Sequence, residues 1–176
     1  MLIELGKRDD AAGILGQLMK DHPLSPHAVP GALWLGQIHL ESGKVKEAET
    51  LLTGLLSREG LNDDDKAQTC RTLASVMEAQ TNYIRAVEFL DRAVKLAADP
   101  MVLDQSRLQR AKLMIRAGRR DEGEAALHEW IGANAANPHA SAALLSWADE
   151  LFKAGDYESA HREYQYYQEV FSDDPG

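Results

Sequence analysis

Small and large residues recur along this chain at a fixed distance. Alanine or glycine returns every 37 or 38 residues, a large residue follows each one four positions later, and a turn residue precedes each one by five positions. The three sets are Ala11, Ala48, Ala86, Gly123 and Ala160; Leu15, Leu52, Leu90, Leu127 and Tyr164; and Gly6, Gly43, Thr81, Gly118 and Gly155. A fixed period of this size indicates a stacked array of repeated units.

Each period contains two stretches of apolar residues at helical spacing, separated by the turn residue. The clearest pair is Ala32–Leu40 and Val45–Leu56, joined by Glu41-Ser42-Gly43-Lys44. Apolar stripes of this kind predict amphipathic helices. The other predicted helices span residues 9–19, 67–79, 83–96, 102–117, 122–131, 140–154 and 157–171.

These helices predict an all-α fold, a right-handed superhelical solenoid of antiparallel helix pairs with about four and a half repeats. The whole chain, 1–176, is then one array of a partial unit and four full units. Their bounds are approximately 1–24, 25–61, 62–98, 99–136 and 137–173.

Capping residues mark the start of the first helix in each unit. Ser25-Pro26, Asp99-Pro100 and Asn137-Pro138 each place a capping side chain before proline, and Asn62 holds the same place in its unit. Pro30 lies one turn after Ser25 and indicates either a kink or a later helix start. Asp174-Pro175-Gly176 repeats the pattern once more, so we expect a segment of a longer array.

The units resemble tetratricopeptide repeats. The resemblance is carried by Leu35-Gly36, Gly43, Ala48 and Leu52; by Ala74, Tyr83, Ala86, Leu90 and Ala93; and by Trp147-Ala148, Gly155-Asp156-Tyr157 and Ala160. The usual period of that family is 34 residues, and the extra residues here fall between units. The resemblance implies a protein–protein interaction scaffold without cofactor or catalytic activity.

A narrower resemblance covers residues 20–43. They are similar to repeats of bacterial cell-envelope proteins, namely the Tol-Pal-associated periplasmic protein and the outer-membrane assembly lipoproteins. That similarity implies a periplasmic or cell-envelope location, with the cytoplasm as the alternative.

Composition disfavours several other functions. A net charge of −9 argues against nucleic acid as the main ligand, because phosphate binding requires a basic surface. No stretch approaches the apolar length of a membrane span. Cys70 is the single cysteine and the six histidines lack the spacing of a helical zinc site, so we expect no metal. Asp63-Asp64-Asp65 lacks the pattern of a calcium loop and is interpreted as a helix start.

In tetratricopeptide repeats the first helices line a concave groove that binds peptides. The same helical phase in this chain selects Gln37, Glu41, Arg71, Ser75, Glu78, Lys112, Ile115, Arg116, Asp149, Phe152 and Lys153. Four cations and three acids make this groove nearly neutral on an acidic chain. It is therefore suited to an acidic peptide or a chain-terminal carboxylate, with Arg71 and Arg116 as donors. The alternative is that these are solvated side chains or ion pairs within the groove.

The last predicted helix is apolar on more than one side. Its residues Tyr164, Tyr166, Tyr167, Val170 and Phe171 lack the polar face expected of a terminal repeat. Either a further unit covers them, or they form a docking surface through which the chain self-associates. A structural spacer or self-assembly module is therefore the alternative function.

Overall fold

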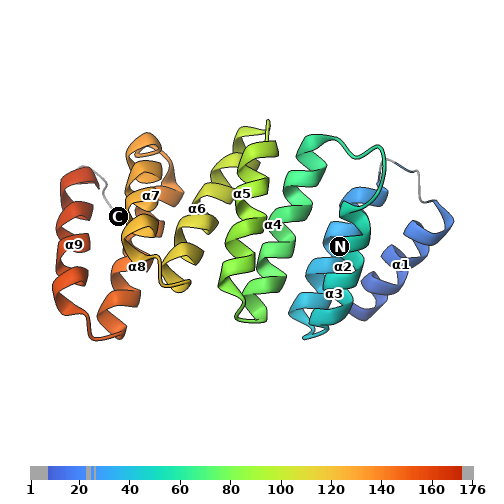
Figure 1. Cartoon of the computed structure of the whole chain (residues 1–176), viewed down its shortest axis with the longest axis horizontal. Coiled ribbons are helices and arrows are strands. Elements are labelled where there is room, and N and C mark those ends of the chain that lie inside the picture. Colours follow the sequence, from blue (N-terminus) through green and yellow to red (C-terminus); the bar gives the residue numbers. More distant parts are fainter. Residues whose placement is uncertain (1–7, 23–24, 26, 172–176) are drawn as a thin grey trace.

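The described part of the chain is entirely helical. The computed structural model describes residues 8–22, 25 and 27–171, and consecutive helices in this part lie side by side as antiparallel pairs (Figure 1). These nine helices are α1 (Arg8–Asp21), α2 (Ala28–Glu41), α3 (Val45–Leu56), α4 (Asp63–Ala79), α5 (Tyr83–Leu96), α6 (Pro100–Arg116), α7 (Arg120–Ala133), α8 (Pro138–Lys153) and α9 (Tyr157–Phe171). The all-α solenoid predicted from the repeat period is confirmed.

The first helices of the pairs begin earlier than the apolar pattern predicts. Helix α4 begins at Asp63, four residues before the predicted start, and α6 and α8 begin two residues early. Their first turns are polar, but Asn62, Asp99 and Asn137 accept hydrogen bonds of 2.7–3.3 Å from backbone N–H groups two or three positions further on. Capping therefore extends each helix beyond its apolar stripe.

Ser25 does not cap a helix, contrary to the prediction. Its Oγ accepts a hydrogen bond from the backbone N–H of His27 at 3.2 Å, within a turn, and α2 begins only at Ala28. The later start is the one that Pro30 allows. As the third residue of α2, proline lacks an N–H that would have no partner within the helix anyway.

The turns within the pairs share one helix-ending geometry. Gly43, Thr81, Gly118 and Gly155 have φ of 73°, 57°, 83° and 82°. Each donates its N–H to the carbonyl three positions back, and the following N–H bonds the carbonyl five positions back. These are the two bonds of the Schellman motif. The predicted turn residues are thus confirmed at four positions, whereas Gly6 lies outside the described residues.

The small residues allow the two helices of a pair to approach closely. Ala48, Ala86 and Ala160 are buried. A Cβ added to Gly36 in α2 would lie 2.9 Å from a methyl group of Leu52, the large residue of the next helix. A Cβ on Gly123 would lie 2.8 Å from a backbone oxygen of α6. Small residues are therefore required where the helices cross.

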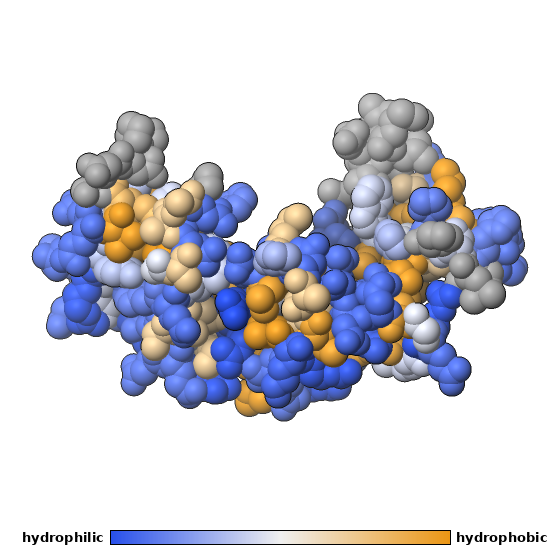
Figure 2. All heavy atoms as spheres, turned by 90° about the horizontal axis from the view of Figure 1, so that it is seen from above, coloured by the Kyte–Doolittle hydropathy of each residue, from blue (hydrophilic) through white to orange (hydrophobic). Residues whose placement is uncertain are grey.

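The pairs form an arc with the first helices on its inner side. Helix α4 contacts both α2 and α6, the first helices of the neighbouring pairs, so the first helices converge. The space-filling view from above shows a hollow on one side of the molecule, between its two ends (Figure 2). The inner side of the arc, formed by the first helices, is where the repeat pattern predicts a groove.

The stacking is weaker at one boundary. One apolar core extends from α3 to α6 and another from α6 to α9. Helix α7 has a smaller contact with α8 than α3 has with α4 or α5 with α6. Helix α6 also has a smaller contact with α8 than α4 has with α2 or with α6. A space therefore remains between α6 and α8.

Candidate functional site

The N-terminal part of the predicted groove is exposed on α2. The amide of Gln37 donates a hydrogen bond to Glu41 at 3.0 Å, so these two side chains stabilise each other along the helix. Trp34 lies one turn earlier and is 60% exposed. A large exposed indole on the inner side of an array is unusual, because tryptophan gains most from burial.

Arg71 of α4 is the electrostatically distinctive residue of the groove. It lines a pocket of about 330 Å³ between α2 and α4 together with Trp34, Gln37, Gln68 and Thr72. Its Nε is buried without an acceptor, and within the described residues its guanidinium has neither hydrogen bond nor ion pair. Desolvation lowers the pKa of Arg71. A half-buried cation without an anion is costly unless a ligand supplies one.

The next residues of the groove are paired with each other. Arg116 of α6 contacts Glu78 of α4 and lies 3.8 Å from a carboxylate oxygen of Glu150 in α8. Ser75 accepts a hydrogen bond of 2.9 Å from the amide of Gln109. Arg116 therefore matches the alternative of an ion pair within the groove, unlike Arg71.

Lys112 and Ile115 of α6 have different surroundings. Lys112 lines a second pocket, and no described residue forms an ion pair with it. Ile115 is half-buried against the C-terminal core and lies beside Gly123 of α7. Ile115 therefore packs between α6 and α7. Its position on α6 lies at the edge of the face that was predicted to line the groove.

The predicted groove residues of α8 lie close to α9. Asp149 accepts a hydrogen bond of 2.6 Å from the hydroxyl of Tyr164, which raises the pKa of that tyrosine. The Phe152 ring contacts the Tyr157 ring edge to face, with centroids 5.2 Å apart. Lys153 is exposed in the last turn of the helix. Of these three, only Lys153 lacks a described partner.

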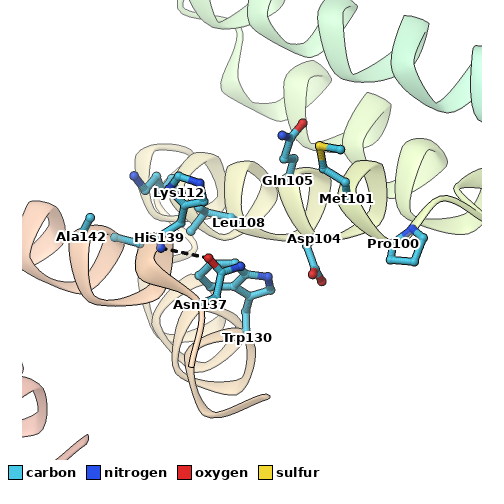
Figure 3. Close-up of a pocket in the computed structure, with 11 residues that line it drawn as sticks. Pro100, Met101, Asp104, Gln105, Leu108, Lys112, Trp130, Asn137, His139 and Ala142 are labelled. Carbon is cyan, nitrogen blue, oxygen red and sulfur yellow. Dashed lines mark hydrogen bonds between the residues drawn. The ribbon is translucent and has the colours of Figure 1, made fainter. Parts of the chain in front are cut away.

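The second pocket fills the space between α6 and α8. It has a volume of about 610 Å³, and Leu108, Trp130 and Ala143 are among its apolar lining residues. Figure 3 shows residues of α6 on one side, the start of α8 on the other and the indole of Trp130 between them. The sequence did not predict this pocket. The sequence does contain one indication of it. Met101, Gln105, Leu108 and Lys112 have helical spacing and therefore lie on one face of α6.

The predicted self-association residues are largely packed inside the last repeats. Phe171 is buried, while Tyr164, Tyr166, Tyr167 and Val170 are half-buried against the C-terminal core. The exposed aromatic residues of this end are instead Phe152 and Tyr157, at 55% and 64% exposure.

A histidine and a carboxylate link α7 to α9. The Nε2 of His128 lies 2.8 Å from a carboxylate oxygen of Glu163, which is only 5% exposed. That hydrogen bond raises the pKa of His128. Protonated His128 therefore compensates a buried charge between the two helices.

Other chemistry is not apparent in the described residues. Residues 8–22, 25 and 27–171 contain no group of three His, Cys, Asp or Glu side chains arranged to hold a metal ion. In the same residues, no helix has the length and apolarity needed to cross a membrane. Cys70 is buried, and desolvation raises the pKa of its thiol, so it behaves as a small apolar residue.

Comparison with known proteins finds similarity to tetratricopeptide repeats in the N-terminal third of the chain. Residues 2–63 match the family model described as tetratricopeptide repeat. No curated protein shows significant similarity to the chain. Proteins with tetratricopeptide repeats are typically non-catalytic scaffolds that bind proteins or peptides.

Solved structures share this fold at low sequence identity. A Podosopora anserina putative kinesin light chain with nearly identical TPR-like repeats has a TM-score of 0.76 and 17% identity, over 99% of this chain and 92% of that chain. The MamA protein has 0.69 and 18%, over 97% and 86%. YrrB, described as a TPR protein with an unusual peptide-binding site, has 0.63 and 17%, over 98% and 82%. At these identities the likeness concerns the fold.

Proposed function

We propose that this chain is a non-catalytic scaffold whose inner groove binds a carboxylate-bearing peptide segment at Arg71. The observation that carries the proposal is the desolvated guanidinium of Arg71, which has no acceptor among the described residues. Replacement of hydrating water by a carboxylate gives a charge-assisted hydrogen bond, stronger than a neutral one.

The surroundings of Arg71 suit a peptide. The pocket beside it is lined by the amide side chains of Gln37 and Gln68, which can bond a peptide backbone, and by the exposed face of Trp34. An acidic side chain and a chain-terminal carboxylate present the same group to Arg71. Both belong to the ligand class, and the experiment separates them.

A second candidate function is self-assembly through the C-terminal repeat. It is favoured by the exposed aromatic pair Phe152 and Tyr157. Sedimentation of the chain over a range of concentrations tests it, with Phe152→Ser/Tyr157→Ser as the variant. Association that survives this double substitution would contradict a role for the pair.

The test of the peptide function is a selection of random displayed peptides, with either free or amidated C-termini. We expect the selected peptides to carry acidic residues or a free C-terminal carboxylate. We also expect these peptides to bind the Arg71→Met variant at least tenfold more weakly than the wild type, which corresponds to a loss of about 1.4 kcal/mol of binding free energy. Arg116→Met is the matched control, because Arg116 is already paired with Glu78.

One comparison in this experiment distinguishes a chain-terminal carboxylate from an acidic side chain. Amidation of the C-terminus abolishes binding only if the terminal carboxylate is recognised. Selected peptides without any carboxylate, or equal binding to Arg71→Met, would overturn the proposal.

The compartment is a separate part of the proposal. The similarity of residues 20–43 to cell-envelope repeats supports a site of action in a bacterial cell envelope. Fractionation of the source cells tests this. Recovery of the protein with the cytoplasmic fraction would contradict it.

A further inference from the structure

The space between α6 and α8 is large enough to hold a short peptide segment with a bulky side chain. It measures about 610 Å³, and its lining includes Leu108, Trp130 and Ala143. Pockets that bind small ligands fall in this range of volume and are lined mainly by apolar groups. Met101 lies at the same pocket and is 66% exposed, so apolar surface continues outwards from it.

The two ends of the pocket carry opposite charges. Asp104 and Lys112 lie eight residues apart on α6, a distance of about 12 Å along a helix. Both line the pocket, and neither forms an ion pair with a described residue. Figure 3 shows His139 close to Lys112 and Asp104 towards the other end. A segment with a base at one end and an acid at the other is therefore complementary to the pocket.

Trp130 supplies the aromatic wall of the pocket. Its side chain is 95% buried (5% exposed) and lines the pocket, yet its Nε1–H has no acceptor among the described residues. The nitrogen itself is shielded from solvent, so the indole ring, and not its N–H, forms the wall that a ligand can contact.

We propose that this pocket binds a bulky apolar side chain of an extended peptide segment whose flanking residues carry a base and an acid. The acid lies at Lys112, the base at Asp104, and the apolar side chain packs against the ring of Trp130. The site deepens the proposed function, because it opens on the same groove and adds an anchor two helix pairs away from that of α2 and α4.

The length of the pocket favours an extended segment over a folded surface. About 12 Å corresponds to roughly four residues of extended chain at 3.3–3.6 Å each. The pocket is on the inner side of the arc, between two helices, where a narrow segment enters more readily than a convex protein face. A peptide with its two charges four positions apart and one bulky apolar residue midway between them fits both dimensions.

The test uses the full chain labelled with ¹⁵N and three capped peptides. The probe is acetyl-Lys-Ala-Phe-Ala-Glu-amide, and its controls replace Phe by Ala or both charged residues by Gln. Trp34, Trp130 and Trp147 each give an indole N–H signal, and Trp130→Phe assigns the signal of interest. The signal of Trp34 reports separately on the pocket beside Arg71.

We expect the probe to shift the Trp130 signal at concentrations up to about 5 mM, and the Ala peptide to bind about tenfold to hundredfold more weakly. The Gln peptide should bind more weakly than the probe. Lys112→Glu should weaken probe binding about tenfold. Ala142→Leu places bulk in the pocket and should abolish binding, whereas Ala125→Leu, on an exposed face of α7 outside the pocket, should not change it.

Arg71→Met separates this inference from the function proposed above. It should leave the Trp130 shift unchanged, because Arg71 lines the other pocket. An unmoved Trp130 signal, equal binding of the Ala peptide or full binding to Ala142→Leu would overturn the site, even if carboxylate peptides still require Arg71.

Discussion

Replacement of Arg71 by methionine should make the protein more stable while removing its proposed ligand. Methionine keeps an unbranched, flexible stem in the half-buried space between α2 and α4 but carries no charge. The guanidinium that it replaces is desolvated, with a buried Nε that has no acceptor. Substitution therefore removes an unfavourable burial and breaks no described interaction.

The magnitude follows from that one unsatisfied group. A buried donor without a partner costs about 1–3 kcal/mol, and the lower end applies because Arg71 is only half-buried. We expect the free energy of unfolding to rise by about 1 kcal/mol. For a chain of this length that corresponds to an increase in Tm of about 2–4 °C.

Urea unfolding followed by circular dichroism measures this change, with the m-value as the check that the same surface unfolds. Arg116→Met is the matched control. It breaks the pair with Glu78 at an exposed site and should lower stability by about 0–1 kcal/mol. If Arg71→Met is instead less stable than the wild type, at an unchanged m-value, Arg71 contributes to the fold and the reasoning is wrong.

Three further predictions concern the scaffold and use the same unfolding assay. Gly123→Ala should destabilise by about 1–3 kcal/mol, because the added Cβ meets backbone atoms of α6 at 2.8–2.9 Å. Gly36→Ala meets only the side chain of Leu52 and should cost less; the reverse order would contradict the crossing geometry. Thr81→Gly should stabilise by about 1 kcal/mol, because Thr81 has φ 57°, whereas Thr81→Ala should bring no such gain. Glu163 raises the pKa of His128 in the folded state. Protonated His128 therefore stabilises the fold fully at pH values below its ordinary pKa near 6.5, and this stabilisation is lost as the pH rises through the folded-state pKa. The unfolding free energy should therefore fall as the pH rises above about 6.5, and His128→Gln should lack this part of the slope; an identical slope would exclude the pair as its cause.

The repeat pattern predicted most of the scaffold because its columns record packing between neighbours in sequence. The helices at 45–56, 83–96 and 157–171 have the predicted bounds. Boundaries were missed where a polar cap, and not an apolar residue, starts the helix, as at Asp63 of α4. Ser25 was misassigned because its hydrogen bond within a turn uses the same side chain as a cap would.

The groove was harder to predict because its electrostatics depend on residues one repeat away. Arg71 and Arg116 lie on the same helical face, two turns apart in the repeat, yet Arg116 contacts Glu78, 38 positions earlier, and Arg71 has no such partner among the described residues. The pocket at Trp130 depends on the separation of α6 from α8. A local pattern does not encode that distance.

The small contact between α7 and α8 has a consequence for how the array unfolds and bends. In a linear array the cooperativity of unfolding depends on the coupling between nearest neighbours. The described polar links across this boundary are few: Arg120 bonds Asp156 at 2.7 Å, His128 lies 2.8 Å from Glu163, and Arg116 lies 3.8 Å from Glu150. We expect α8 and α9 to exchange their amide hydrogens together and before the central helices. We expect the curvature of the array to change first at this boundary, with rearrangement of the C-terminal core that spans it and without change in the core of α3 to α6.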